Sequence, residues 1–94
     1  MSQKALILTG LILREKRGVS ALCPELDVAS QGADVREAKA MLKEAVMGYL
    51  EACFESNLPY LRPVPKTEDP RLADKESIVA LFQMNVDLLV RVHA

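Results

Sequence analysis

The sequence has few aromatic residues and few residues that carry redox or metal chemistry. Of its 94 residues two are Phe, two are Tyr and none is Trp, so the core must be built from smaller aliphatic side chains. The one histidine, His93, is next to the C-terminus, where we expect an exposed side chain without the orienting partner that catalysis needs. Because a chain of this length has room for a single modest core, we expect self-association as a homodimer or a larger oligomer.

Charge of either sign is also not in excess. A formal net charge of -1 argues against a general polyanion binder, which needs clustered Lys and Arg. Arg14, Lys16 and Arg17 form a small basic cluster, and a weak contact with RNA stays open there. No apolar run is long enough to span a membrane, and no signal peptide is visible. Cys23 and Cys53 form no metal-binding pair, so we expect two free thiols and a cytoplasmic location.

A catalytic or metal-binding set is missing as well. Asp34 and Glu37 are better explained as caps of a helix. Glu25 and Asp27 are better explained as residues of a solvated turn. A ribonuclease-H-type site would need carboxylates on the first strand to hold Mg²⁺, and residues 5–13 contain none. With no Gly-rich phosphate loop either, we expect no catalytic residue, no metal, no cofactor and no enzyme.

Three strands are predicted at the start of the chain. Residues 5–13 are rich in Leu and Ile, and Gly18 can take the positive φ of the hairpin turn that follows. Val19–Cys23 is a second strand, which Pro24 ends because proline lacks a backbone donor. Residues 28–31 form a third. Connections this short favour an antiparallel meander.

The clearest predicted helix covers residues 34–56. Asp34 is a good N-cap, and Glu37 three residues later completes a capping box. Asn57 can adopt a left-handed conformation after the last turn, and Pro59 prevents continuation. Apolar residues recur at helical spacing and predict a surface helix that packs on a core: Val35, Ala38, Leu42, Ala45, Val46, Tyr49, Leu50 and Cys53.

The last third of the chain has two parts. Residues 57–77 form a Pro-rich loop, with a short helical turn near residues 70–73. From Ile78 onward every second residue is apolar, which predicts a strand over residues 78–93. This strand is much longer than usual, so it must either bend or outgrow its own sheet and pair with another chain. The candidate interface residues on it are Phe82, Met84, Val86, Leu88 and Val90.

The predicted architecture is therefore one α+β domain over residues 1–94. Residues 1–56 form a β-β-β-α core, residues 57–77 a loop, and residues 78–93 a C-terminal strand. The sheet is antiparallel, and the one main helix packs on one of its faces.

Residues 5–56 resemble the HicB-like antitoxin family, and the motifs that carry the resemblance lie within residues 19–46. In that family a strand leads into "CPEL", then "SQG", then a capping residue and a helix of the form "EEA..NLKEA". The order and spacing agree here, and the matching residues are Cys23, Pro24, Glu25, Leu26, Ser30, Gln31, Gly32, Asp34, Glu37 and Ala38. The resemblance implies a partial ribonuclease-H-like fold without ribonuclease activity. It also implies binding to HicA-like toxins, which are small mRNA-cleaving proteins.

The leading functional hypothesis is thus an antitoxin-type protein that neutralises a HicA-like toxin. A homo-oligomeric scaffold or a small-ligand-binding protein is the alternative, and a weak RNA binder is the second alternative. DNA is not an expected partner, because no helices follow the terminal strand to form the DNA-binding module that many relatives carry.

Overall fold

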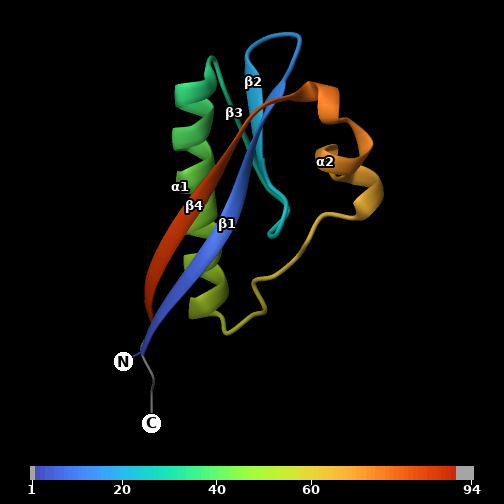
Figure 1. The fold of residues 1–94 in the computed structure, drawn as a ribbon. Coiled ribbons are helices and arrows are strands. Elements are labelled where there is room, and N and C mark those ends of the chain that lie inside the picture. The colour runs from blue at the N-terminus through green and yellow to red at the C-terminus, as the bar shows by residue number, and fades with distance from the viewer. Residues whose placement is uncertain (1, 91–94) are drawn as a thin grey trace.

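The structure, a computed structural model, describes the backbone of residues 2–90 and the side chains of residues 5–87. Four antiparallel strands form one open sheet in the order β3-β2-β1-β4. They are β1 (Ser2–Arg14), β2 (Val19–Cys23), β3 (Val28–Gly32) and β4 (Ile78–Val90). The long helix α1 (Val35–Glu55) crosses one face of this sheet (Figure 1). The predicted α+β class, with three strands, one main helix and a last strand, is confirmed.

Tight turns connect the first three strands, as predicted. Gly18 has a φ of 73° and closes the β1–β2 hairpin. Asp27 has a φ of 53° and closes the β2–β3 turn, where an aspartate tolerates the left-handed conformation. β2 and β3 then pair over their full lengths, from Val19 opposite Gly32 to Cys23 opposite Val28.

The start of α1 carries the predicted capping box. The Asp34 carboxylate accepts a hydrogen bond from the Glu37 amide at 2.8 Å, and the Glu37 carboxylate accepts one from the Ala33 amide at 3.1 Å. These two bonds satisfy backbone donors that a helix N-terminus leaves unpaired. At the other end Asn57 has the expected positive φ of 53°.

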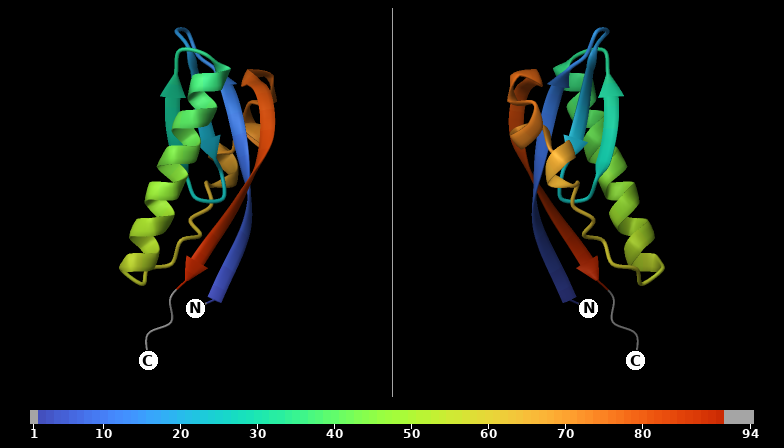
Figure 2. Two further views of the ribbon diagram at one scale, coloured as in Figure 1. Left: turned by 90° about the vertical axis from the view of Figure 1, so that its left-hand side faces the viewer. Right: turned by 90° about the vertical axis from the view of Figure 1, so that its right-hand side faces the viewer.

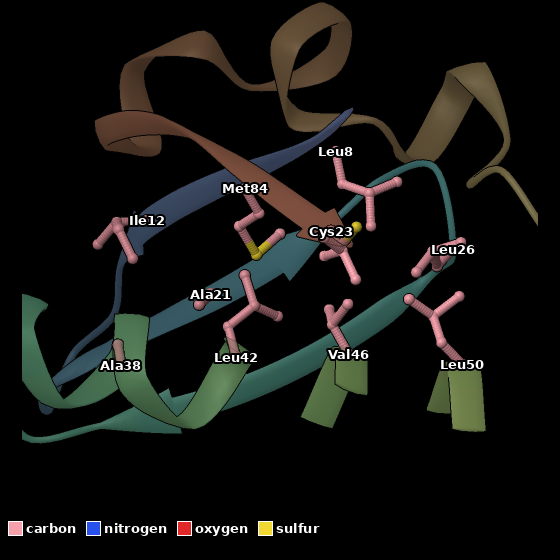
Figure 3. Packing of buried hydrophobic residues seen from close by; sticks show 11 residues of the cluster. Leu8, Ile12, Ala21, Cys23, Leu26, Ala38, Leu42, Val46, Leu50 and Met84 are labelled. Atoms are coloured by element: carbon pink, nitrogen blue, oxygen red, sulfur yellow. The ribbon is translucent and has the colours of Figure 1, made fainter. Parts of the chain in front are cut away.

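A single aliphatic core lies between α1 and the sheet (Figure 3). The inward face of α1 contributes small and medium side chains at helical spacing, and the strands contribute alternate residues. Its most buried members are Leu8, Ile12, Ala21, Cys23, Leu26, Ala38, Leu42, Val46, Leu50, Met84 and Val86.

The Pro-rich segment covers part of the opposite face of the sheet. It contains 3₁₀ turns at Lys66–Glu68 and Lys75–Ser77 and the short helix α2 (Pro70–Ala73), which lies across the sheet from α1 (Figure 2). The helical turn predicted there is confirmed. Leu11 alternates with the core-facing residues of β1 and is nevertheless fully buried. A second, smaller apolar layer therefore exists on this face.

The length of β4 has a different cause from the one its sequence suggested. β4 does not outgrow its sheet, because β1 is equally long and pairs with it from Ser2 opposite Val90 to Leu13 opposite Ile78. A register shift at Ile12/Leu13 supplies a bulge. β2 pairs only with residues Leu11 to Arg14 of β1, so the two long strands continue beyond the meander as a two-stranded ribbon (Figure 2).

Two glycines allow a sharp test of how closely β3 and α1 pack. A Cβ on Gly32 would lie 2.9 Å from the Cα of Ala38, so Gly32→Ala should lower the free energy of unfolding by about 1–3 kcal/mol. Gly48 is exposed in the middle of α1 with open space around it, so Gly48→Ala should raise it by about 0.5–1 kcal/mol. Urea unfolding followed by circular dichroism measures both. A shift in the same direction for the two variants would contradict this packing.

Candidate functional site

Three of the five candidate interface residues of β4, Phe82, Met84 and Val86, pack against the protein's own core. Met84 and Val86 are only 4% and 8% exposed and pack in the core against α1. Phe82 is half-buried against the same cluster, and its ring lies over Gly10 of β1 with no room for a Cβ between them. The side chains of Leu88 and Val90 lie outside the described residues, as does His93. The described part of the apolar face of β4, up to Val86, therefore serves the protein's own core.

Most residues of the family-like motifs have structural positions. Cys23, Pro24, Leu26 and Ala38 are buried, and the Ser30 hydroxyl donates to the Ala38 carbonyl at 3.4 Å. Gly32 allows β3 to approach α1, Asp34 and Glu37 cap α1, and Gln31 is exposed. The structure gathers the motifs around the β2–β3 turn and the first turns of α1. They are thereby explained as determinants of the fold.

Glu25 lies in the predicted turn between β2 and β3, but its side chain is half-buried and hydrogen-bonded, whereas we expected it to be solvated. Its carboxylate accepts hydrogen bonds from the Thr9 amide at 3.0 Å and from the Thr9 hydroxyl at 2.6 Å. Thr9 lies on β1 just past the point where β2 stops pairing. The Glu25 carboxylate therefore accepts the hydrogen bond from the Thr9 amide that a carbonyl of a longer β2 would accept. Burial alone raises the pKa of Glu25, but the hydrogen bonds from Thr9 outweigh it and hold this pKa below its usual value.

Cys23 lies beside Glu25 and is unsuited to nucleophilic chemistry. Its thiol donates to the Glu25 carboxylate, with 3.6 Å between Sγ and Oε1. Burial, and then the negative charge of Glu25, raise the pKa of Cys23 to about 12. Because the thiolate is the reactive form, this thiol stays protonated and inert at neutral pH. Cys53 is also a free and buried thiol.

A partly buried ion pair adjoins this region from the Pro-rich segment. Asp69 is 7% exposed, and its carboxylate accepts bidentate hydrogen bonds from the Arg71 guanidinium, the shortest of which is 2.7 Å. The bonds from Arg71 hold the pKa of Asp69 below its usual value. Asp69 raises the pKa of Arg71, and Glu25 adds a further attraction. The sequence signal for this pair was an aspartate directly before Pro70, the first residue of α2.

The polar side chains of this region, Thr9, Cys23, Glu25, Asp69 and Arg71, form hydrogen bonds with one another. Within the described part of the chain, no buried side-chain nitrogen or oxygen lacks a hydrogen-bond partner. No three side chains of His, Cys, Asp or Glu among these residues gather in a way that could hold a metal ion. No helix in the described range is long and apolar enough to cross a membrane. The arrangement of Thr9, Cys23 and Glu25 thus works as a structural lock between β1 and the β2–β3 turn.

The basic cluster near the first hairpin is exposed, but negative charge surrounds it. Lys16 and Arg17 line a shallow hollow together with Glu15 and Glu37. Arg14 at the end of β1 is also exposed. Because both signs of charge meet here, the hollow offers little net attraction for a phosphate backbone.

An exposed apolar surface lies on the ribbon, on the side away from α1. Ile7 is 71% exposed, Leu81 62% and Val79 44%. Leu81 is paired with Leu11, and Ile7 is four residues from Leu11 on the same strand, so Ile7 and Leu81 point to one face, whereas Val79 is the extra residue at the bulge next to Leu81. We call Ile7, Val79 and Leu81 the ribbon face. Sequence reasoning missed it because the opposite residues of β4 have the stronger apolar pattern.

No model of a known protein family matches the chain, and comparisons with curated proteins and with solved structures find no match either.

The state of Cys23 can be tested by its effect on stability in alkali. In the unfolded chain the thiol ionises near pH 9.0, whereas in the folded protein it stays protonated to about pH 12. The free energy of unfolding should therefore fall between these values as the pH rises, by about 1.4 kcal/mol per pH unit for this group. Cys23→Ala should lose this part of the pH dependence in urea unfolding between pH 8.5 and about 10.5. Equal slopes for the two proteins would contradict a buried, protonated thiol.

The role of Glu25 can be tested at the acid end. Its lowered pKa means that its stabilising effect is present above the pKa of the unfolded state and is lost as the pH falls through the folded value. Glu25→Gln should lower the free energy of unfolding at pH 7 by about 1–3 kcal/mol, and its stability should then change less from pH 6 to 3 than that of the unaltered protein. Thr9→Val, which removes one donor, is the matched variant and should cost less, about 1 kcal/mol.

Proposed function

We propose that this protein is a non-catalytic, HicB-like antitoxin-type protein that binds and neutralises a small HicA-like, mRNA-cleaving toxin. The ribbon face is the observation that carries the binding part of the proposal. Ile7 and Leu81 are large, exposed and on one face of paired strands, and Val79 is exposed at the neighbouring bulge. Large exposed apolar side chains on a sheet face are typical of protein–protein contact sites.

The kind of partner rests on the resemblance of residues 5–56 to the HicB-like family. The order of the strands and α1 is compatible with a partial ribonuclease-H-like fold, and we propose this relationship for the domain. Cys23 and Glu25 are engaged in structural hydrogen bonds, which supports a binding role for the motif region over a catalytic one. The two free thiols suit a reducing compartment, so we propose a cytoplasmic location.

A toxin-rescue assay tests this proposal. The chain should restore the growth of cells that express a HicA-like toxin, beginning with any toxin encoded in the adjacent reading frame, and the two proteins should copurify. The double variant Ile7→Lys/Leu81→Lys should lose both effects, because two charges would be buried in the contact. Its thermal unfolding should stay close to that of the unaltered protein, since both side chains are exposed.

Leu61→Lys is the matched control, because Leu61 is 62% exposed but lies in the Pro-rich segment. It should rescue growth fully. Failure of the unaltered chain to bind or rescue against every HicA-like toxin tried would contradict the antitoxin role. If the ribbon-face variant instead changes the mass of the protein alone in light scattering, the face joins copies of this chain in a homo-oligomeric scaffold.

A further inference from the structure

A second surface lies on the other side of the sheet, between α1 and the outer edge of β4. One hollow lies between α1 and β4 and a second lies on the surface of α1 alone, and because Lys43 lines both we treat them together as one site. We call it the α1–β4 groove. Its first part is lined by Val35, Arg36, Lys39, Ala40 and Lys43, and its second by Lys43, Val46, Met47 and the β4 residues Met84, Asn85, Val86 and Asp87.

Positive charge follows the helix side of this groove. Arg36, Lys39 and Lys43 are spaced three and four residues apart, so they form one row along α1. The Lys39 ammonium lies 4.7 Å from the centre of the Phe82 ring, which places the row beside β4. Among residues 5–87 the only ion pair is that of Arg71 with Asp69, so no carboxylate neutralises the row.

The acidic residues of α1 are on a different flank. Glu37, Glu44 and Glu51 recur every seven residues and form a row of their own. The only carboxylate that lines the groove within the described range is Asp87, at the far end of its second part. The helix thus presents a basic flank to the groove and an acidic row elsewhere, although the chain as a whole is nearly neutral.

The strand side of the groove offers backbone hydrogen bonds. β4 is the outermost strand of the sheet and pairs only with β1 among the described strands (Figure 2). In an antiparallel sheet every second residue of such a strand directs its N–H and C=O groups away from its partner. These groups form a template for a further strand, beside the part of β4 that Lys39 and Lys43 approach.

We propose that the α1–β4 groove binds an extended acidic segment of a partner protein, which adds to the edge of β4 as a fifth strand. Alternate side chains of the segment face α1, and carboxylates at these positions meet Arg36, Lys39 and Lys43. Main-chain pairing supplies affinity, and the basic row selects the sequence. The site is separate from the ribbon face, so the proposal holds whether or not the toxin-binding function is correct.

A second copy of this chain fits the groove less well. In antiparallel pairing of two β4 edges about a twofold axis, both α1 helices lie on the same side of the joined sheet. Their basic rows would then face each other across the contact, and like charges at this distance repel. A partner with carboxylates at the same positions removes this repulsion.

Fluorescence anisotropy with a synthetic peptide tests the proposal. The probe is a labelled peptide of about eight residues that alternates glutamate with threonine, which favours an extended strand. It should bind, and its affinity should fall at least about tenfold when the central backbone amides are methylated, because methylation removes the donors for strand pairing. A lysine–threonine peptide should not bind. Equal binding of the methylated peptide would overturn strand addition.

Charge reversal on the protein locates the site. Arg36→Glu/Lys43→Glu should weaken binding of the acidic peptide at least about tenfold. Lys16→Glu/Lys66→Glu makes the same change in net charge at exposed positions outside the groove, and it should leave the affinity nearly unchanged. An equal loss in both variants would overturn the assignment to the groove.

Two more binding measurements distinguish a protein partner from RNA and the groove from the ribbon face. A single-stranded RNA of equal charge that binds more tightly than the peptide, and loses affinity in the groove variant, would overturn the choice of a protein partner. The ribbon-face variant Ile7→Lys/Leu81→Lys should bind the peptide as the unaltered protein does. Failure of toxin rescue with intact peptide binding would therefore count against the proposed function alone.

Discussion

The hydrogen bonds of the Pro24–Glu25 dipeptide are the interaction on which the rest of the structure depends. β2 ends at Cys23, and the Glu25 carboxylate takes over its role by binding the amide and hydroxyl of Thr9. The backbone carbonyls of the same dipeptide accept hydrogen bonds from the Arg62 and Val64 amides. This one short turn therefore supplies a hydrogen-bond partner to β1 beyond the end of β2. It also holds the Pro-rich segment against the sheet.

This arrangement explains why the two faces of the sheet are covered to different extents. α1 covers one face over a continuous aliphatic core, whereas the Pro-rich segment covers only part of the other face. Since β2 stops pairing with β1 at Leu11, the ribbon of β1 and β4 continues beyond the rest of the sheet without a cover on that second face. Ile7 is exposed there as a direct consequence.

The structural features that depend only on residues close together in the sequence were predicted correctly. The hairpin glycine, the capping box at Asp34 and the stripe of α1 are all contained in short windows, and they were confirmed. The partner of β4 was not predictable in this way, because the polar start of β1 hides how far that strand extends. Glu25 was misread for a related reason. Thr9, which donates both of its short hydrogen bonds, is sixteen positions away in the sequence, and no local pattern connects the two.

An open strand edge can pair with other chains and cause aggregation. The positive charges beside β4 affect which chains can pair with its edge. Unprotected edges invite pairing between identical chains. The row of Arg36, Lys39 and Lys43 lies where a second copy would place the same row, so it opposes edge-to-edge stacking of this chain. The same charges attract a strand that carries carboxylates. In the proposed binding mode, a single feature of α1 would both disfavour self-pairing and select a partner, and the positive residues of this nearly neutral helix lie on the flank where both effects would act.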